Sequence, residues 1–195
     1  MSKAPKGSKQ AKINGALPIF MSTKLGDVVG DILSLLNTGM VTPAGLAIHG
    51  AASAVVKAGS AFVALVNGVA VSVAAGDLSA LVGTLPTANS AAWAFYVNAA
   101  GTVTTGPMTA AASTAALALA ALQSQIIAAL PQPIGAQQPV YKAMVGFIVV
   151  TNATGSNFVG GTTALDTGSL TVTYYSPVGG LSLAPLVNLE ARTQY

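Results

Sequence analysis

The chain has 195 residues, which is long enough for one domain with a sizeable buried core. Cysteine is absent, and this excludes disulfide frameworks, thiolate nucleophiles, zinc–cysteine sites and iron–sulfur clusters. Only 7% of the residues are charged, whereas an ordinary soluble domain carries about 25%. Because so few charges leave a monomer poorly hydrated, we expect much of the surface to contact other protein.

Residues 1–24 are expected to form an extended basic arm. Lys3, Lys6, Lys9 and Lys12 lie in a segment with hardly any large apolar side chain before Ile13, so the segment cannot close a core by itself. A basic run of this kind attracts phosphate groups or acidic protein surfaces. We interpret the four lysines as contacts with a partner protein, with a solvated tail as the alternative.

Residues 25–45 are expected to hold a short docking helix and a linker. Apolar residues from Leu25 to Leu36 recur at helical spacing, with Thr23 near the start and Gly39 past the end. Asp27 and Asp31 would share one face of this helix. Since no histidine or Asp-x-Asp loop accompanies them, we attribute these carboxylates to the helix dipole rather than to a metal site.

Residues 46–195 are expected to form a β-rich oligomerising domain with a C-terminal tail. From Ala51 the apolar period changes to two, and the segments Val55–Val66 and Val69–Val73 flank Asn67-Gly68. Asn-Gly readily supplies the two left-handed residues of a type I′ turn. The sequence therefore predicts a β-hairpin here.

A second hairpin is predicted over Trp93–Thr105. Its first strand places Trp93, Phe95 and Val97 on one face, its turn is 98–101, and Thr102 begins the return strand.

A helix is predicted over Thr109–Leu130, with Thr109 as its cap and Pro131 as its end. Apart from one stripe of leucine and isoleucine, the faces of this helix are mainly alanine, so we expect the helix to be enclosed or to lie at a subunit interface. A membrane span is the weaker alternative, because polar residues interrupt the segment. The candidate interface stripe is Leu119, Leu122, Ile126 and Leu130.

Strands resume after a proline-rich connector. Val140–Thr151 is apolar on both faces and is predicted to be central in a sheet, followed by short strands at Asn157–Val159 and Ser169–Ser176. The predicted fold class is mainly β, or β-rich α+β: antiparallel hairpins forming a sandwich or barrel-like domain, one alanine-rich helix and an extended N-terminal arm.

Titratable groups that could converge in a catalytic site are few. His49 is the only histidine, and no nucleophile-elbow pattern surrounds any serine, so a structural or exposed histidine is favoured over a hydrolase. The glycine-rich segments 155–161 and 179–180 lack the lysine of a phosphate loop and are predicted to be turns. We expect no enzyme activity, cofactor, metal or small-molecule substrate.

Four segments together resemble a known class of protein. They are Trp93–Gly106, Leu130–Pro139, Val145–Asn152 and Phe158–Asp166. Their order over residues 90–176 resembles small virion proteins of tailed bacteriophages, which act as capsid decoration, cement or head-fibre proteins.

The resemblance implies a homo-oligomer, most often a trimer, on the capsid surface of the virion, with the major capsid protein as its partner. It supplies no catalytic residues, and neither membrane nor nucleic acid is expected as a partner. The alternative is a receptor-binding or fibre module in which the aromatic hairpin around Trp93 recognises a host surface glycan.

Overall fold

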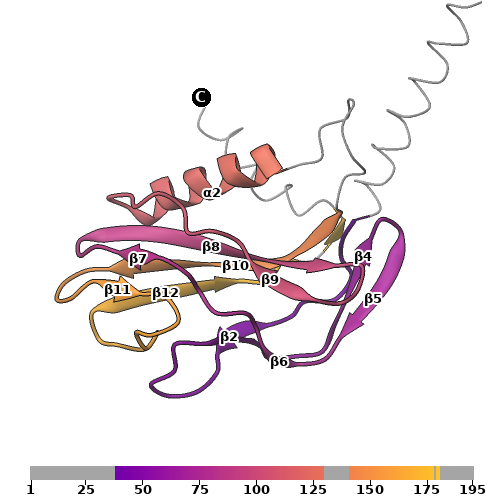
Figure 1. Ribbon diagram of the computed structural model, residues 1–195, viewed down its shortest axis with the longest axis horizontal. Helices are drawn as coiled ribbons and strands as arrows, with labels where there is room; N and C mark the ends of the chain where they lie inside the picture. The colour runs from indigo at the N-terminus through magenta and orange to yellow at the C-terminus, as the bar shows by residue number, and fades with distance from the viewer. Residues whose placement is uncertain (1–37, 130–140, 178, 181–195) are drawn as a thin grey trace, which may run out of the picture.

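A computed structural model describes residues 38–129, 141–177 and 179–180 of the chain (Figure 1). The expected basic arm with its four lysines, the expected helix over 25–36 and the stripe residue Leu130 lie outside these residues. Within the described part the chain is mainly β, with four antiparallel sheets, one helix and no closed barrel. The predicted fold class is therefore confirmed, and the sandwich is the form that it takes.

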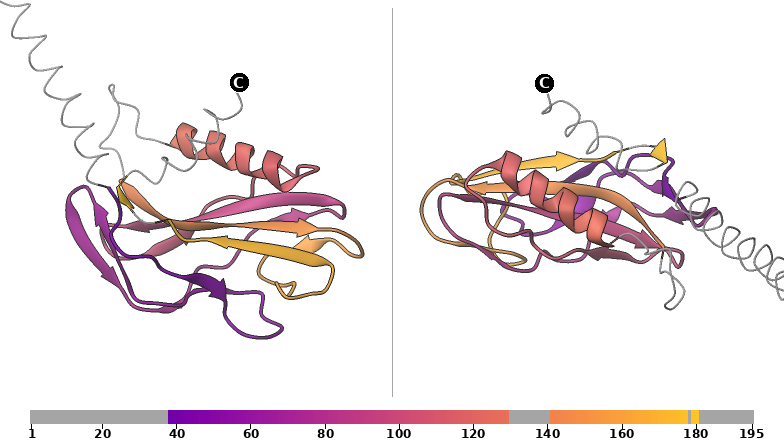
Figure 2. Two further views of the ribbon diagram at one scale, coloured as in Figure 1. Left: turned by 180° about the vertical axis from the view of Figure 1, so that it is seen from behind. Right: turned by 90° about the horizontal axis from the view of Figure 1, so that it is seen from above.

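The central layer is a four-stranded sheet in the order β12-β10-β8-β9. Its strands are β8 (Asn89–Asn98), β9 (Val103–Thr105), β10 (Lys142–Asn152) and β12 (Leu170–Tyr175). β10 lies between two neighbours and is almost wholly buried, as its two-sided apolar run predicted. The helix α2 (Ala115–Ala129) covers one face of this sheet (Figure 2).

The other face of the central sheet is covered by smaller sheets. One has the order β13-β1-β4-β5, a second has the order β2-β3-β6, and β7 pairs with β11. Their bounds are β1 (Gly39–Met40), β2 (Leu46–Ile48), β3 (Val56–Ala58), β4 (Phe62–Val66), β5 (Val69–Val73), β6 (Gly76–Asp77), β7 (Thr84–Leu85), β11 (Phe158–Val159) and β13 (Gly179–Gly180).

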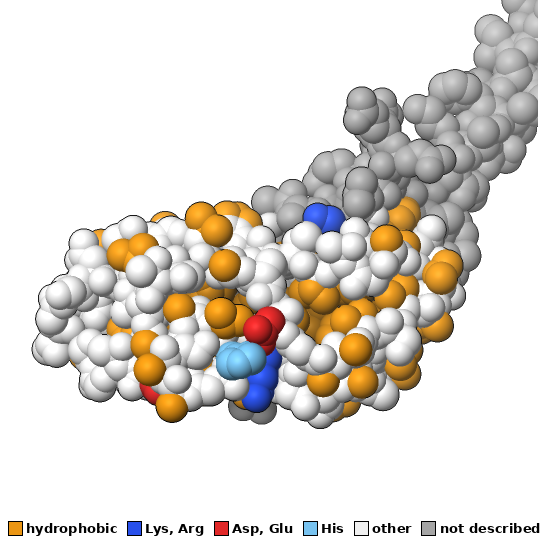
Figure 3. All heavy atoms as spheres, turned by 60° about the horizontal axis from the view of Figure 1, so that its bottom comes forward, with side chains coloured by type: hydrophobic (Ala, Val, Ile, Leu, Met, Phe, Trp, Pro, Cys, Tyr) orange, Lys and Arg blue, Asp and Glu red, His pale blue; other side chains and the backbone are white. Residues whose placement is uncertain are grey.

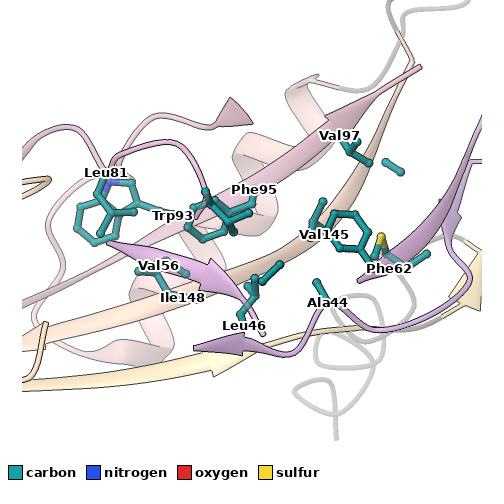
Figure 4. Close-up of a cluster of buried hydrophobic side chains, with 14 of the residues drawn as sticks. Ala44, Leu46, Val56, Phe62, Leu81, Trp93, Phe95, Val97, Val145 and Ile148 are labelled. Carbon is teal, nitrogen blue, oxygen red and sulfur yellow. The ribbon is translucent and has the colours of Figure 1, made fainter. Parts of the chain in front are cut away.

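The main hydrophobic core lies between these two β layers (Figure 4). Odd-numbered residues of β8 such as Trp93 and Phe95 point into it, and Phe62 of β4 meets them from the opposite layer. Even-numbered Ala92 and Ala94 point to the other side, where they form a second cluster with α2. Full burial of a side chain such as Phe62 stabilises the fold by about 1.5–3 kcal/mol.

A β-bulge in β10 keeps both faces of that strand apolar. Met144 pairs with Tyr96 and Gly146 pairs with Phe95, so Val145 is the extra residue. As a result Met144 and Phe147 both face α2, although they are three residues apart, and Val145 faces the main core. Gly146 fits here because a Cβ would lie 2.4 Å from the Tyr175 carbonyl oxygen.

The hairpin at Asn67-Gly68 is confirmed: β4 and β5 pair, and the turn residues have φ of 52° and 77°. The segment Val55–Val66, which has an apolar period of two, contains two strands rather than one. The chain turns at Gly59, whose N–H donates to the Gly45 carbonyl 3.0 Å away, so β3 and β4 belong to different sheets.

The hairpin over Trp93–Thr105 is also confirmed, although its first strand begins earlier, at Asn89. The Asn98 side-chain oxygen accepts hydrogen bonds from the Ala100 and Thr102 amides at 3.0 Å and so closes the turn.

The helix begins at Ala115, and the prediction of a start at Thr109 is wrong. Thr114 caps it, because its hydroxyl oxygen accepts from the Leu117 amide at 3.3 Å. Thr109 is fully buried; its hydroxyl accepts from the Ala92 amide at 2.9 Å, and its own amide donates to the Ala92 carbonyl. Thr109 therefore continues the sheet edge beside β8 instead of starting the helix.

The β fold also extends to the N-terminal side of residue 46. β1 pairs with both β4 and β13, and Met40 and Ala44 are buried in the main core. Residues 39–45, expected to be linker, are thus part of the β domain.

Candidate functional site

Short strands gather three of the few ionisable side chains in one place. His49 follows β2, Lys57 lies in β3 and Asp77 in β6, and the pairing of the three strands sets Lys57 opposite Asp77. The His49 Nδ1 atom contacts the Asp77 carboxylate, and the Lys57 Nζ atom donates to the His49 carbonyl at 3.0 Å. Figure 3 shows the pale-blue histidine beside red and blue side chains on a surface that is mainly white and orange.

The exposure of this cluster limits its chemistry. The His49 and Asp77 side chains are 56% and 51% exposed, and a solvated ion pair of this kind contributes at most about 1 kcal/mol. Among the described residues, no serine or threonine hydroxyl bonds to the His49 ring, and no group of three His, Asp or Glu side chains could hold a metal ion. The pair is an exposed polar contact, as predicted for His49.

Asp166 has a structural position. Its carboxylate accepts a hydrogen bond from the Ala52 amide at 2.8 Å, and Ala52 has a φ of 55°. The neighbouring Leu165 amide donates to the Ser53 carbonyl, also at 2.8 Å. Asp166 therefore fastens the 164–167 turn to the loop between β2 and β3. Asp27, Asp31 and Glu190 lie outside the described residues.

The aromatic side chains divide between the core and the surface. Trp93 and Phe95 are fully buried and offer no ring face to a sugar.

Burial raises the pKa of Tyr96 above its ordinary value of 10.0. Burial, with a smaller contribution from the negative charge of Asp166, also raises the pKa of Tyr174. Tyr175 is partly exposed and stacks on Phe147 with ring centroids 4.5 Å apart.

The glycine-rich segment over 155–161 forms turns on both sides of β11, as predicted. The prediction of a turn at 179–180 is wrong, because Gly179–Gly180 form β13 and pair with β1. The Gly160 amide donates to the Gly83 carbonyl at 2.9 Å, and a Cβ on Gly160 would lie 2.9 Å from the Leu81 carbonyl. The absence of a side chain at Gly160 therefore permits close approach of the two backbone segments.

The predicted interface stripe on the helix points inward over most of its described length. Leu122 and Ile126 are buried against β8 and β10, and Leu119 is partly buried beside them. Leu117, which the stripe did not include, is 55% exposed on the helix. A subunit contact through α2 would therefore use the face that carries Leu117 rather than Leu122 and Ile126.

The described surface is almost without charge. Lys57, Lys142, Asp77 and Asp166 are the charged residues of the described ranges, and their formal charges cancel. Large apolar side chains are exposed instead, on several different elements. They are Val41, Val69, Val82, Leu117, Val159 and Tyr175.

In the described ranges no helix has the length and apolar character needed to cross a membrane. Comparison with known proteins finds no matching family model, no matching curated protein and no matching solved structure.

Proposed function

We propose that the chain is a virion structural protein of a tailed bacteriophage, a capsid decoration or cement protein that assembles with itself and clamps neighbouring capsid subunits. The observation that carries the proposal is the neutral surface of the described β domain, which has two lysines and two aspartates. A surface of this kind gains little from hydration of charged groups and loses little when another neutral protein surface covers it.

The exposed apolar side chains support the same function. Val82, in the loop between β6 and β7, is 70% exposed, and Leu117 of α2 is 55% exposed. Burial of such side chains against a neighbour contributes about 25 cal/mol for each Å² of apolar area. An interface of ordinary size buries about 1,600 Å², so several contacts of this kind around a capsid junction would resist internal pressure.

The basic arm would supply a second contact with the capsid. Lys3, Lys6, Lys9 and Lys12 concentrate positive charge in one short segment, while the described domain is neutral. Acidic patches on the outer surface of a capsid would attract this arm at long range. The neutral domain would then add short-range apolar burial.

Co-sedimentation with capsids tests the proposal. The full chain is mixed with empty capsid shells of the phage that encodes it, and the bound fraction is measured along with the temperature at which the shells open. We expect saturable binding at a fixed ratio to the capsid protein and a higher opening temperature.

The matched variant replaces Lys3, Lys6, Lys9 and Lys12 with glutamine. We expect this variant to bind more weakly, with a smaller dependence on salt, and to keep the fold of the β domain. A full chain that is a well-behaved monomer and does not sediment with shells would refute the proposal.

A further inference from the structure

The strand β5 ends the sheet β13-β1-β4-β5 without a neighbour on its outer side among the described residues. Its sequence is Val69-Ala70-Val71-Ser72-Val73, and its residues are mostly exposed apart from Val71. An edge strand presents unpaired backbone N–H and C=O groups that can pair with another strand. Proteins that stay monomeric usually protect such an edge with lysine, proline or a bulge, and β5 has none of these.

The geometry of the hairpin determines which backbone groups are free. In a two-residue hairpin the residues that flank the turn form a hydrogen-bonded pair, and such pairs recur at every second residue. The backbone groups that form hydrogen bonds to β4 are therefore those of Val69, Val71 and Val73. These residues pair with Val66, Ala64 and Phe62. The backbone groups of Ala70 and Ser72 point away from the sheet.

The sequence of β5 matches itself when it is reversed. In an antiparallel pair of two copies centred on Val71, Val69 lies opposite Val73 of the second copy and Ala70 lies opposite Ser72. Valine then meets valine, small residues meet small residues, and no like charges face each other. Ala70 and Ser72 would exchange four backbone hydrogen bonds across the two-fold axis.

We propose that β5 is a self-association edge, at which two copies of this chain pair antiparallel about Val71 and join their sheets. A second copy is the occupant that this near-palindrome fits best. The inference rests on the self-assembly in the proposed function and specifies its contact. It also makes that contact two-fold, in place of the three-fold ring that the resemblance implies.

Cross-linking of two single-cysteine variants tests the register, since the natural chain has no cysteine to interfere. Val69→Cys and Val73→Cys are oxidised separately and as a mixture. In the proposed pair these positions face each other in a non-hydrogen-bonded pair with Cα atoms about 4.5 Å apart, which a disulfide spans. Two Val69 residues would be about 13 Å apart along the strands, which is beyond its reach.

We expect disulfide-linked dimers from the mixture, at least ten times more than from either variant alone. Equal cross-linking of the single variants, or none in the mixture, would overturn the proposed register.

Light scattering on the full chain provides the second measurement. We expect a mass twice the 19.2 kDa of one chain. The double variant Ala70→Lys and Ser72→Lys sets lysine opposite lysine across the pair and should become monomeric. The matched control, Thr154→Lys and Ser156→Lys, adds the same charge at exposed positions in the loop between β10 and β11 and should keep the dimer, with circular dichroism confirming that both variants fold.

A wild-type mass of one or three chains, or equal masses for the two lysine variants, would refute the β5 contact. Because capsid co-sedimentation is measured separately, a chain that binds shells but fails to cross-link would lose this inference and keep the proposed function.

Discussion

Trp93 meets Phe158 edge to face, with ring centroids 5.8 Å apart and ring planes inclined by 75°. The two rings come from β8 and β11, so the contact joins the helix-covered sheet to the small β7–β11 sheet. The Trp93 indole N–H also donates to the Val82 carbonyl at 3.0 Å. The Trp93 side chain thus connects β8 both to β11 and to the loop before β7.

Trp93→Ala should therefore destabilise the whole domain. Removal of a large buried aromatic ring costs about 3–5 kcal/mol, and the Val82 carbonyl also loses its donor. Urea unfolding monitored by circular dichroism measures the loss. The single tryptophan should show blue-shifted emission when folded. Glycan binding lost in Trp93→Ala with unchanged stability would contradict this placement.

Gly146→Ala should destabilise the fold through the bulge in β10. The added Cβ would lie 2.4 Å from the Tyr175 carbonyl oxygen and 2.6 Å from the Leu46 Cδ1 atom, so the backbone of β12 must move away from β10 and the Leu46 side chain must also shift. Overpacking of this kind costs about 1–3 kcal/mol. Gly168→Ala is the matched control, because nothing lies within 4 Å of its added Cβ. Equal midpoints of urea unfolding for the two variants would show that the site relaxes freely.

The hairpins and the central strand were predictable because their signals are local. Asn67-Gly68 encodes its own turn, and the two-sided apolar run of β10 requires cover on both faces. The bulge at Val145 was not predictable, because it depends on which residues of β8 lie opposite. Strands β1 and β2 have two and three residues, too few to show a period.

The contact between His49 and Asp77 was also not predictable from the sequence, because it depends on strand pairing. His49 and Asp77 are 28 residues apart and meet because β3 pairs with both β2 and β6. The spacing of the two residues in the sequence does not predict this pairing of the strands. Likewise, the self-matching pattern of β5 can be seen in the sequence, but its place at an open sheet edge cannot. Only the order β13-β1-β4-β5 makes it a candidate contact.

The two threonines near the helix should differ in their effects on stability. Thr109→Val leaves the Ala92 amide without its buried acceptor, which costs about 1–3 kcal/mol. Thr114→Ala removes the helix cap at a cost of about 0.5–2 kcal/mol. Amide hydrogen exchange separates the two: Thr114→Ala should speed exchange in the first turn of α2, and Thr109→Val should speed it at Ala92. Faster exchange at the helix start in Thr109→Val alone would restore Thr109 as the cap.

Tyr96 should make the fold sensitive to alkaline pH. Burial raises its pKa in the folded chain above the ordinary value of 10.0, so the folded chain holds this proton more tightly than the unfolded chain does. The stabilisation is fully present below about pH 10, and it is lost as the pH rises through the folded-state pKa, because the unfolded chain then gives up its proton more readily. The free energy of unfolding should therefore fall above about pH 10.

Tyr96→Phe separates this effect from the other tyrosines. The variant has no phenol to ionise, so its free energy of unfolding should fall less steeply with alkaline pH than that of the natural chain, as measured by urea unfolding at a series of pH values. Tyr174→Phe is the comparison: its effect should shrink in high salt, because part of its raised pKa comes from the Asp166 charge. Identical alkaline profiles for the natural chain and Tyr96→Phe would mean that the pKa of Tyr96 is the same in the folded and the unfolded chain, which would contradict this prediction.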